Sequence, residues 1–74
     1  MTLEDLEMDN TAKIKNIKED KQVVRRRMLD LGIMPGTCIT PVLKSPSGSP
    51  RAYEVRGSLI AIRTEEAKKI DLEV

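Results

Sequence analysis

The sequence predicts a mainly β protein, a small five-stranded barrel with one α-helix inserted after the first strand and a one-turn helix before the last strand. Three observations support this fold class. Five short segments have the composition of strands separated by turn residues, and only one segment has the apolar spacing of a longer helix. The 74 residues suffice for one small domain but not for two. Many short strands in so short a chain favour a barrel.

The N-terminal ten residues differ in charge from the rest of the chain, because they carry four acidic residues and no basic one. Thr2 could cap a single helical turn that puts Leu3 and Leu6 on a shared face. We therefore expect residues 1–10 to be a flexible or short helical segment in front of a barrel domain formed by residues 11–74.

The first strand is predicted for residues 11–17, with the sequence TAKIKNI. Ala12 and Ile14 alternate there with Lys13 and Lys15. Such alternation is typical of a strand that has one side toward the core and the other toward water.

The inserted helix is predicted from about Lys21 to Leu31, with Asp20 as its cap. Val24, Met28 and Leu31 have the i, i+4, i+7 spacing of one apolar stripe, which would face the core.

Two helix-breaking signals follow the helix and have different structural roles. Gly32 can adopt the left-handed conformation that ends a helix, so that Ile33 packs back on Met28 in a Schellman motif. Pro35 followed by Gly36 specifies a type II turn, which leads the chain into the next strand.

The second strand is predicted for residues 37–43. Pro41 lies inside it and has no N–H to donate, so this stretch should lie at a sheet edge or form a bulge. The sequence SPSGSP at residues 45–50 has the composition of a surface loop.

Two more strands are predicted for residues 52–56 and 58–63, with only Gly57 as a tight corner between them. Residues 64–67 should form a one-turn helix with Thr64 as its cap and acidic residues in its first turn. The last strand is predicted from the alternation of Ile70, Leu72 and Val74.

The composition excludes several classes of function. The chain has no histidine, tryptophan or phenylalanine, and Cys38 and Tyr53 are its only cysteine and aromatic residue. Zinc sites of the Cys/His type and Ser-His-Asp or Cys-His catalytic groups are therefore absent. We expect no enzymatic activity. No apolar run approaches the ~20 residues that cross a bilayer, so the protein should not be embedded in a membrane.

Two motifs, in the same order along the chain, resemble the FeoA family of bacterial ferrous iron transport. The first is LDLGIMPG at residues 29–36, and the second is VRG at 55–57, followed by AIR at 61–63 and EA at 66–67. The resemblance covers residues 11–74. It implies a five-stranded SH3-like barrel, in agreement with the strand count. Ser58 departs from the family, which often has a large aromatic or apolar residue there.

The resemblance also implies a function. FeoA proteins are accessory to FeoB, a membrane transporter with a cytoplasmic GTP-binding domain, and the same domain occurs in metal-dependent repressors. We therefore expect a cytoplasmic, non-enzymatic regulatory protein that binds the cytoplasmic part of FeoB. No cofactor should be required, although Fe²⁺ or another divalent transition metal could bind weakly and the metal ligands are unknown. The chain could also form a homo-oligomer.

The partner surface should combine the inserted helix with the loop that precedes the third strand. Its candidate residues are Arg25, Arg26, Met28, Met34, Pro46, Arg51 and Tyr53. A purely structural role is expected for Gly32, Pro35, Gly36 and Gly57. The three consecutive arginines at residues 25–27 could instead be a solvated helix face, and Cys38 has no assigned role.

Two alternatives stay open. The chain could be a nucleic-acid-binding SH3-like module that uses the basic residues of 13–27, although a net charge of +1 and a single aromatic residue argue against it. It could also be a weak transition-metal sensor or carrier.

Overall fold

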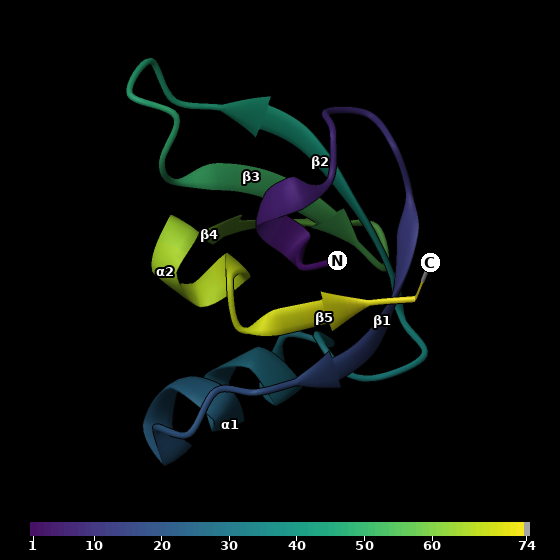
Figure 1. Cartoon of the computed structure of the whole chain (residues 1–74), viewed down its shortest axis with the longest axis vertical. Coiled ribbons are helices and arrows are strands. Elements are labelled where there is room, and N and C mark those ends of the chain that lie inside the picture. Colours follow the sequence, from purple (N-terminus) through teal and green to yellow (C-terminus); the bar gives the residue numbers. More distant parts are fainter. Residues whose placement is uncertain (74) are drawn as a thin grey trace.

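The computed structural model describes residues 1–73. Within them, antiparallel strands form one five-stranded sheet in the order β4-β3-β2-β1-β5 (Figure 1). The strands are β1 (Ala12–Ile17), β2 (Cys38–Lys44), β3 (Arg51–Val55), β4 (Ser58–Ile62) and β5 (Ile70–Leu72). The predicted fold class is confirmed. Ile70 and Leu72 form the last strand as predicted, whereas the predicted alternation at Val74 lies outside the described residues.

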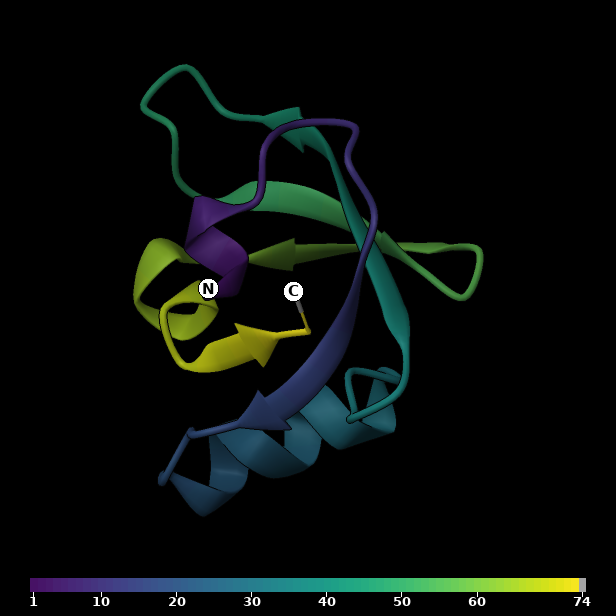
Figure 2. The same ribbon diagram turned by 45° about the vertical axis from the view of Figure 1, so that its right-hand side comes forward.

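The helical elements cover the open sides of the curled sheet. They are the 3-10 helix η1 (Leu3–Asp5), the α-helix α1 (Gln22–Asp30) and the one-turn helix α2 (Thr64–Ala67). Figure 2 shows α1 running beneath β1, and η1 beside α2, which it contacts. Among residues 1–73, no helix has the length and apolar character needed to span a bilayer.

The sheet wraps around a single apolar core. Leu3, Ile14, Ile39, Tyr53 and Ile70 are among its most deeply buried side chains. Within the described residues no ladder of hydrogen bonds joins β4 to β5. The barrel is therefore open along this seam.

Two bulges adjust which side chains reach the core. In β1 the register shifts between Ile14 and Asn16, which turns Ile17 toward the core instead of Asn16. In β2 it shifts between Pro41 and Leu43. Pro41 thus lies at a bulge, as predicted, and not at an edge, since β2 is a central strand.

The end of α1 has the predicted Schellman geometry. Gly32 has φ +88°, its N–H donates to the Leu29 carbonyl at 3.0 Å, and the Ile33 N–H donates to the Met28 carbonyl at 2.9 Å. Ile33 is buried, as expected for the apolar residue that packs back on the helix.

The turn after the helix and the later hairpin also use left-handed residues. Gly36 has φ +91° and the Thr37 N–H donates to the Met34 carbonyl at 3.1 Å, which fits the predicted type II turn after Pro35. The corner between β3 and β4 is formed by two residues and not by Gly57 alone: Arg56 has φ +53° and Gly57 +82°.

Three local predictions about the helices are wrong. Asp20 does not cap α1, because Lys21 occupies the N-cap position, and the Lys21 N–H donates to the carboxylate of Glu19. Leu31 does not belong to the core stripe, since it lies beyond the end of α1 and is 44% exposed. Thr64 is not the cap of α2, because Arg63 occupies that position.

The cap of α2 depends on a carboxylate inside the helix. The N–H of Arg63, the N-cap, donates to the Glu66 side chain at 3.1 Å. Thr64 is the first helical residue, and its N–H donates to the Ser49 hydroxyl at 3.2 Å. The loop before β3 is thereby tied to α2.

Candidate functional site

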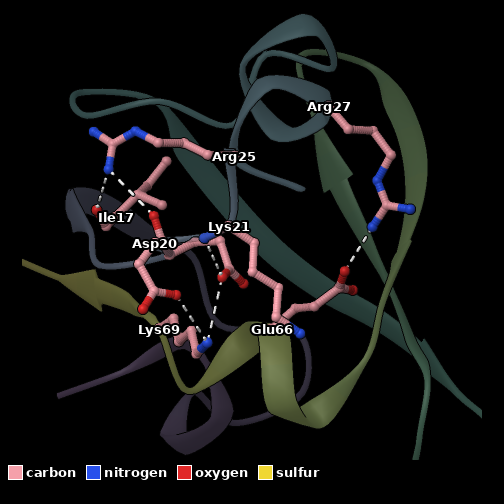
Figure 3. Close-up of polar contacts among 8 residues, drawn as sticks. Ile17, Asp20, Lys21, Arg25, Arg27, Glu66 and Lys69 are labelled. Atoms are coloured by element: carbon pink, nitrogen blue, oxygen red, sulfur yellow. Dashed lines mark hydrogen bonds and ion pairs between the residues drawn. The ribbon is translucent and has the colours of Figure 1, made fainter. Parts of the chain in front are cut away.

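The three consecutive arginines of α1 have three different environments. Arg25 donates to the carbonyl oxygens of Ile17 at 3.1 Å and Glu19 at 3.4 Å, which fastens the helix to the end of β1 (Figure 3). Arg27 pairs with Glu66 of α2 at 2.6 Å. Among the described residues no hydrogen bond or ion pair holds the exposed Arg26. The arginines therefore do not form one basic patch.

A buried carboxylate fixes the start of α1, and sequence reasoning missed it. Glu19 accepts from the Lys21 N–H at 3.1 Å and from the Lys69 ammonium at 3.3 Å. Lys69 also lies 3.7 Å from the Asp20 carboxylate (Figure 3). The hydrogen bond to Glu19 raises the pKa of Lys69, and the charges of both carboxylates act in the same direction, whereas desolvation opposes them.

We expect the Lys69–Glu19 pair to make the free energy of unfolding fall at alkaline pH. A lysine whose pKa is raised by folding stabilises the native state below its unfolded pKa of about 10.4, and this contribution is lost as the pH rises through the folded pKa. Burial also raises the pKa of Tyr53, so deprotonation of Tyr53 likewise lowers the stability as the pH rises. Urea unfolding from about pH 8 to about pH 11 should therefore show a smaller alkaline loss in Lys69→Met than in wild type. Equal losses in both proteins would contradict the role of Lys69.

Two of the predicted contact residues belong to the core. Met28 and Tyr53 are 2% and 1% exposed, so their side chains cannot meet a partner in this structure. Arg51 is half-buried and donates to the carbonyl oxygens of Glu4 and Leu6, both at 3.4 Å. Arg51 therefore ties the N-terminal segment to β3.

The remaining candidates do not form one surface. Arg26 and Pro46 are exposed, and Met34 is half-buried. Figures 1 and 2 place α1 and the loop between β2 and β3 at opposite ends of the molecule. The predicted combination of helix and loop is thus not brought together, and each part would have to act separately.

A groove that the sequence did not predict lies between the C-terminal half of α1 and β4. It has a volume of about 200 Å³, and we call it the α1–β4 groove. Its lining includes Arg27, Leu31, Ile33, Ile60, Ile62 and Glu66. Its lining is mainly apolar and includes one ion pair, between Arg27 and Glu66. Such a surface can take apolar side chains of a partner.

Metal-ligating side chains are scattered. Within residues 1–73 no three His, Cys, Asp or Glu side chains lie together in a way that could hold a metal ion. Cys38 is exposed on β2. The paired carboxylates of Glu19 and Asp20 are both engaged by Lys69.

The family model of the FeoA domain matches residues 1–74. Among curated proteins, the chain is similar to a fusion of Fe(2+) transport protein A and the Fe(2+) transporter FeoB from Porphyromonas gingivalis, with 32% identity over 74 residues. This alignment covers all of the chain but only 9% of the fusion protein.

Two solved structures are also similar. A FeoA-like protein from Clostridium acetobutylicum is 36% identical, with a TM-score of 0.87, over 100% of this chain and 85% of that one. FeoA of Stenotrophomonas maltophilia, a procaryotic SH3 domain protein complexed with zinc, is 28% identical, with a TM-score of 0.86, over 99% of this chain and 89% of that one. The predicted SH3-like fold is confirmed.

Proposed function

The chain belongs to the FeoA domain family, and from this premise we propose that it is a non-enzymatic accessory protein of ferrous iron transport. In this proposal it binds the cytoplasmic part of the FeoB transporter through the surface of its barrel and acts on the cytoplasmic side of the membrane. Its effect is on the assembly or the nucleotide cycle of the transporter.

The observation that carries the proposal is the fusion protein of P. gingivalis, in which a segment 32% identical to this chain is joined to a FeoB transporter. A covalent link holds two domains at a high effective concentration, on the order of millimolar for short linkers, so that even a weak contact is populated. Where the two are not linked, the same contact must form between separate molecules. We therefore expect the separate chain to bind FeoB through a defined surface, so that changes in this surface alter the affinity.

The test is capture of detergent-solubilised FeoB by the immobilised chain, with nucleotide-free, GDP-bound and GTP-analogue-bound samples in parallel. We expect specific capture whose extent changes with the nucleotide, because a regulatory module must distinguish states of the transporter. A chain unfolded by heat serves as the control for non-specific adsorption. If no nucleotide state gave capture above this control, the proposal would be wrong.

A metal is not part of the proposed activity. Zinc is bound to the S. maltophilia relative, but the dispersed carboxylates of residues 1–73 suit only weak association of Fe²⁺ or another divalent ion. Equilibrium dialysis with Fe²⁺ or Mn²⁺ near neutral pH should give well under one tightly bound ion per chain. Tight binding of one equivalent would favour the alternative of a metal sensor or carrier.

Nucleic acid is not a proposed partner either. Arg25 and Arg27 are engaged within the molecule, which leaves Arg26 as the one arginine of the cluster whose side chain has no hydrogen bond or ion pair among residues 1–73. Binding to RNA or DNA at low salt, with a steep loss of affinity as salt increases, would contradict this and favour the nucleic-acid alternative.

A further inference from the structure

The two edge strands of the sheet, β5 and β4, differ in what covers them. β5 has three residues, and the N-terminal segment covers it: Thr2 forms a bridge with Asp71, and the Leu72 N–H donates to the Met1 carbonyl at 2.9 Å. β4 has five residues, none of them charged, and no strand within residues 1–73 pairs with the side that faces away from β3. We call this side the β4 edge. Long uncharged edges are templates for pairing with another chain.

The geometry of the hairpin identifies the backbone groups at the β4 edge. Arg56 and Gly57 form a two-residue turn with positive φ at both positions, so the closing pair of Val55 and Ser58 is hydrogen-bonded. Hydrogen-bonded and non-hydrogen-bonded pairs alternate along an antiparallel ladder. The N–H and C=O groups of Leu59 and Ala61 therefore point away from β3.

These groups have no partner among residues 1–73, since neither the backbone nor the side-chain hydrogen bonds of this part of the chain include them. Both residues are exposed, and Leu59 is one of the large apolar side chains that the molecule leaves in water. Desolvation of this edge costs little if an added strand supplies the missing bonds.

The α1–β4 groove lies next to this edge. Ile60 and Ile62 contribute to it from β4, and Leu31 and Ile33 from the end of α1. Alternate side chains of a strand added to β4 would point to the same face as Ile60 and Ile62. They would therefore enter the groove, where apolar side chains fit best.

The charge at the groove favours an acidic partner. At the end near α2, the Arg27 side chain is 59% exposed, whereas its partner Glu66 is 14% exposed. The exposed Arg56 side chain passes over Gly32, which lies between the groove residues Leu31 and Ile33, and its Cδ is 3.3 Å from where a Cβ of Gly32 would lie. Two exposed guanidinium groups thus lie at or near the groove, and Glu66, the one carboxylate in its lining, is largely covered.

We propose that the β4 edge is a strand-addition site for an extended segment of the transporter's cytoplasmic part, in which apolar residues alternate and acidic residues flank them. This inference rests on the proposed function and specifies how the contact is made. Main-chain hydrogen bonds to Leu59 and Ala61 would give affinity, and the α1–β4 groove would select the side chains.

The main test is the variant Ala61→Pro in the capture experiment with full-length FeoB. Proline removes the N–H at the β4 edge without removing a bond to β3, and it is tolerated on edge strands. We expect the affinity for FeoB to fall at least about tenfold, with a thermal midpoint close to that of wild type. The matched control is Ala61→Ser, a small change at the same exposed position that keeps the N–H, and it should bind as wild type does.

A second measurement keeps the test valid if Ala61→Pro folds poorly. Hydrogen exchange of the wild-type chain, followed by mass spectrometry with and without FeoB, should show slower exchange in the segment Ser58–Ile62 on binding. The inference is overturned if FeoB is captured while Ala61→Pro binds equally well, or while β4 gains no protection. It is also overturned if the wild-type chain is a dimer that Ala61→Pro makes monomeric, since a second copy would then occupy the edge. Absence of capture by wild type would instead reject the proposed function itself.

Discussion

Replacing Leu3 with alanine is expected to lower the free energy of unfolding by about 2–5 kcal/mol. Leu3 is 0% exposed, and η1, to which it belongs, contacts both α2 and β5. A domain of this size has a total stability on the order of 5–10 kcal/mol, so the variant should lose much of it. The thermal midpoint, measured by circular dichroism, should fall by at least about 10 °C.

The matched control for this variant is Leu43→Ala. Leu43 is 59% exposed on β2, so the same truncation there should change the unfolding free energy by less than about 0.5 kcal/mol. The comparison also tests the predicted division of the chain at residue 10, which stays a prediction. If Leu3→Ala behaved like Leu43→Ala, the first ten residues would be a separate segment. A large loss would make them part of the folded unit.

The parts of the fold that the sequence predicted correctly depend on neighbouring residues. The Schellman ending at Gly32 and the turn at Gly36 need only a few consecutive residues, and the alternation in β1 needs six. The predicted cap of α1 was wrong for a physical reason. Asp20 has the right residue type, but the buried carboxylate of Glu19 is held in place by Lys69, fifty residues away in the sequence.

The candidate site was less predictable because tertiary contacts decide it. Arginines at 25–27 look equivalent in the sequence, yet the partners of Arg25 and Arg27 come from β1 and α2. The α1–β4 groove joins side chains from α1, β4 and α2, which lie far apart in the sequence. One signal was present: residues 58–62, SLIAI, form a strand without any charged residue, which is unusual for a sheet edge.

Replacing Gly32 with alanine is expected to destabilise the protein by about 1–3 kcal/mol, through two separate effects. The backbone there has φ +88°, a conformation that costs an L-residue with a side chain about 1–2 kcal/mol. The added Cβ would also lie 3.3 Å from the Cδ of Arg56, so the Arg56 side chain must move. Chemical denaturation should show a lower midpoint with an unchanged slope.

Gly36→Ala separates these two effects. Gly36 has φ +91°, nearly the same as Gly32, but nothing lies within 4 Å of where its Cβ would be. It should therefore show the backbone cost alone, about 1–2 kcal/mol. The excess in Gly32→Ala then measures the displacement of Arg56. Because Arg56 packs on Gly32, which lies between the groove residues Leu31 and Ile33, its displacement should also weaken capture of FeoB in Gly32→Ala. Capture should be unchanged in Gly36→Ala. Equal stability losses in the two variants would mean that the Arg56 side chain moves aside without a loss of stability. Its packing on Gly32 would then not fix its position next to the groove.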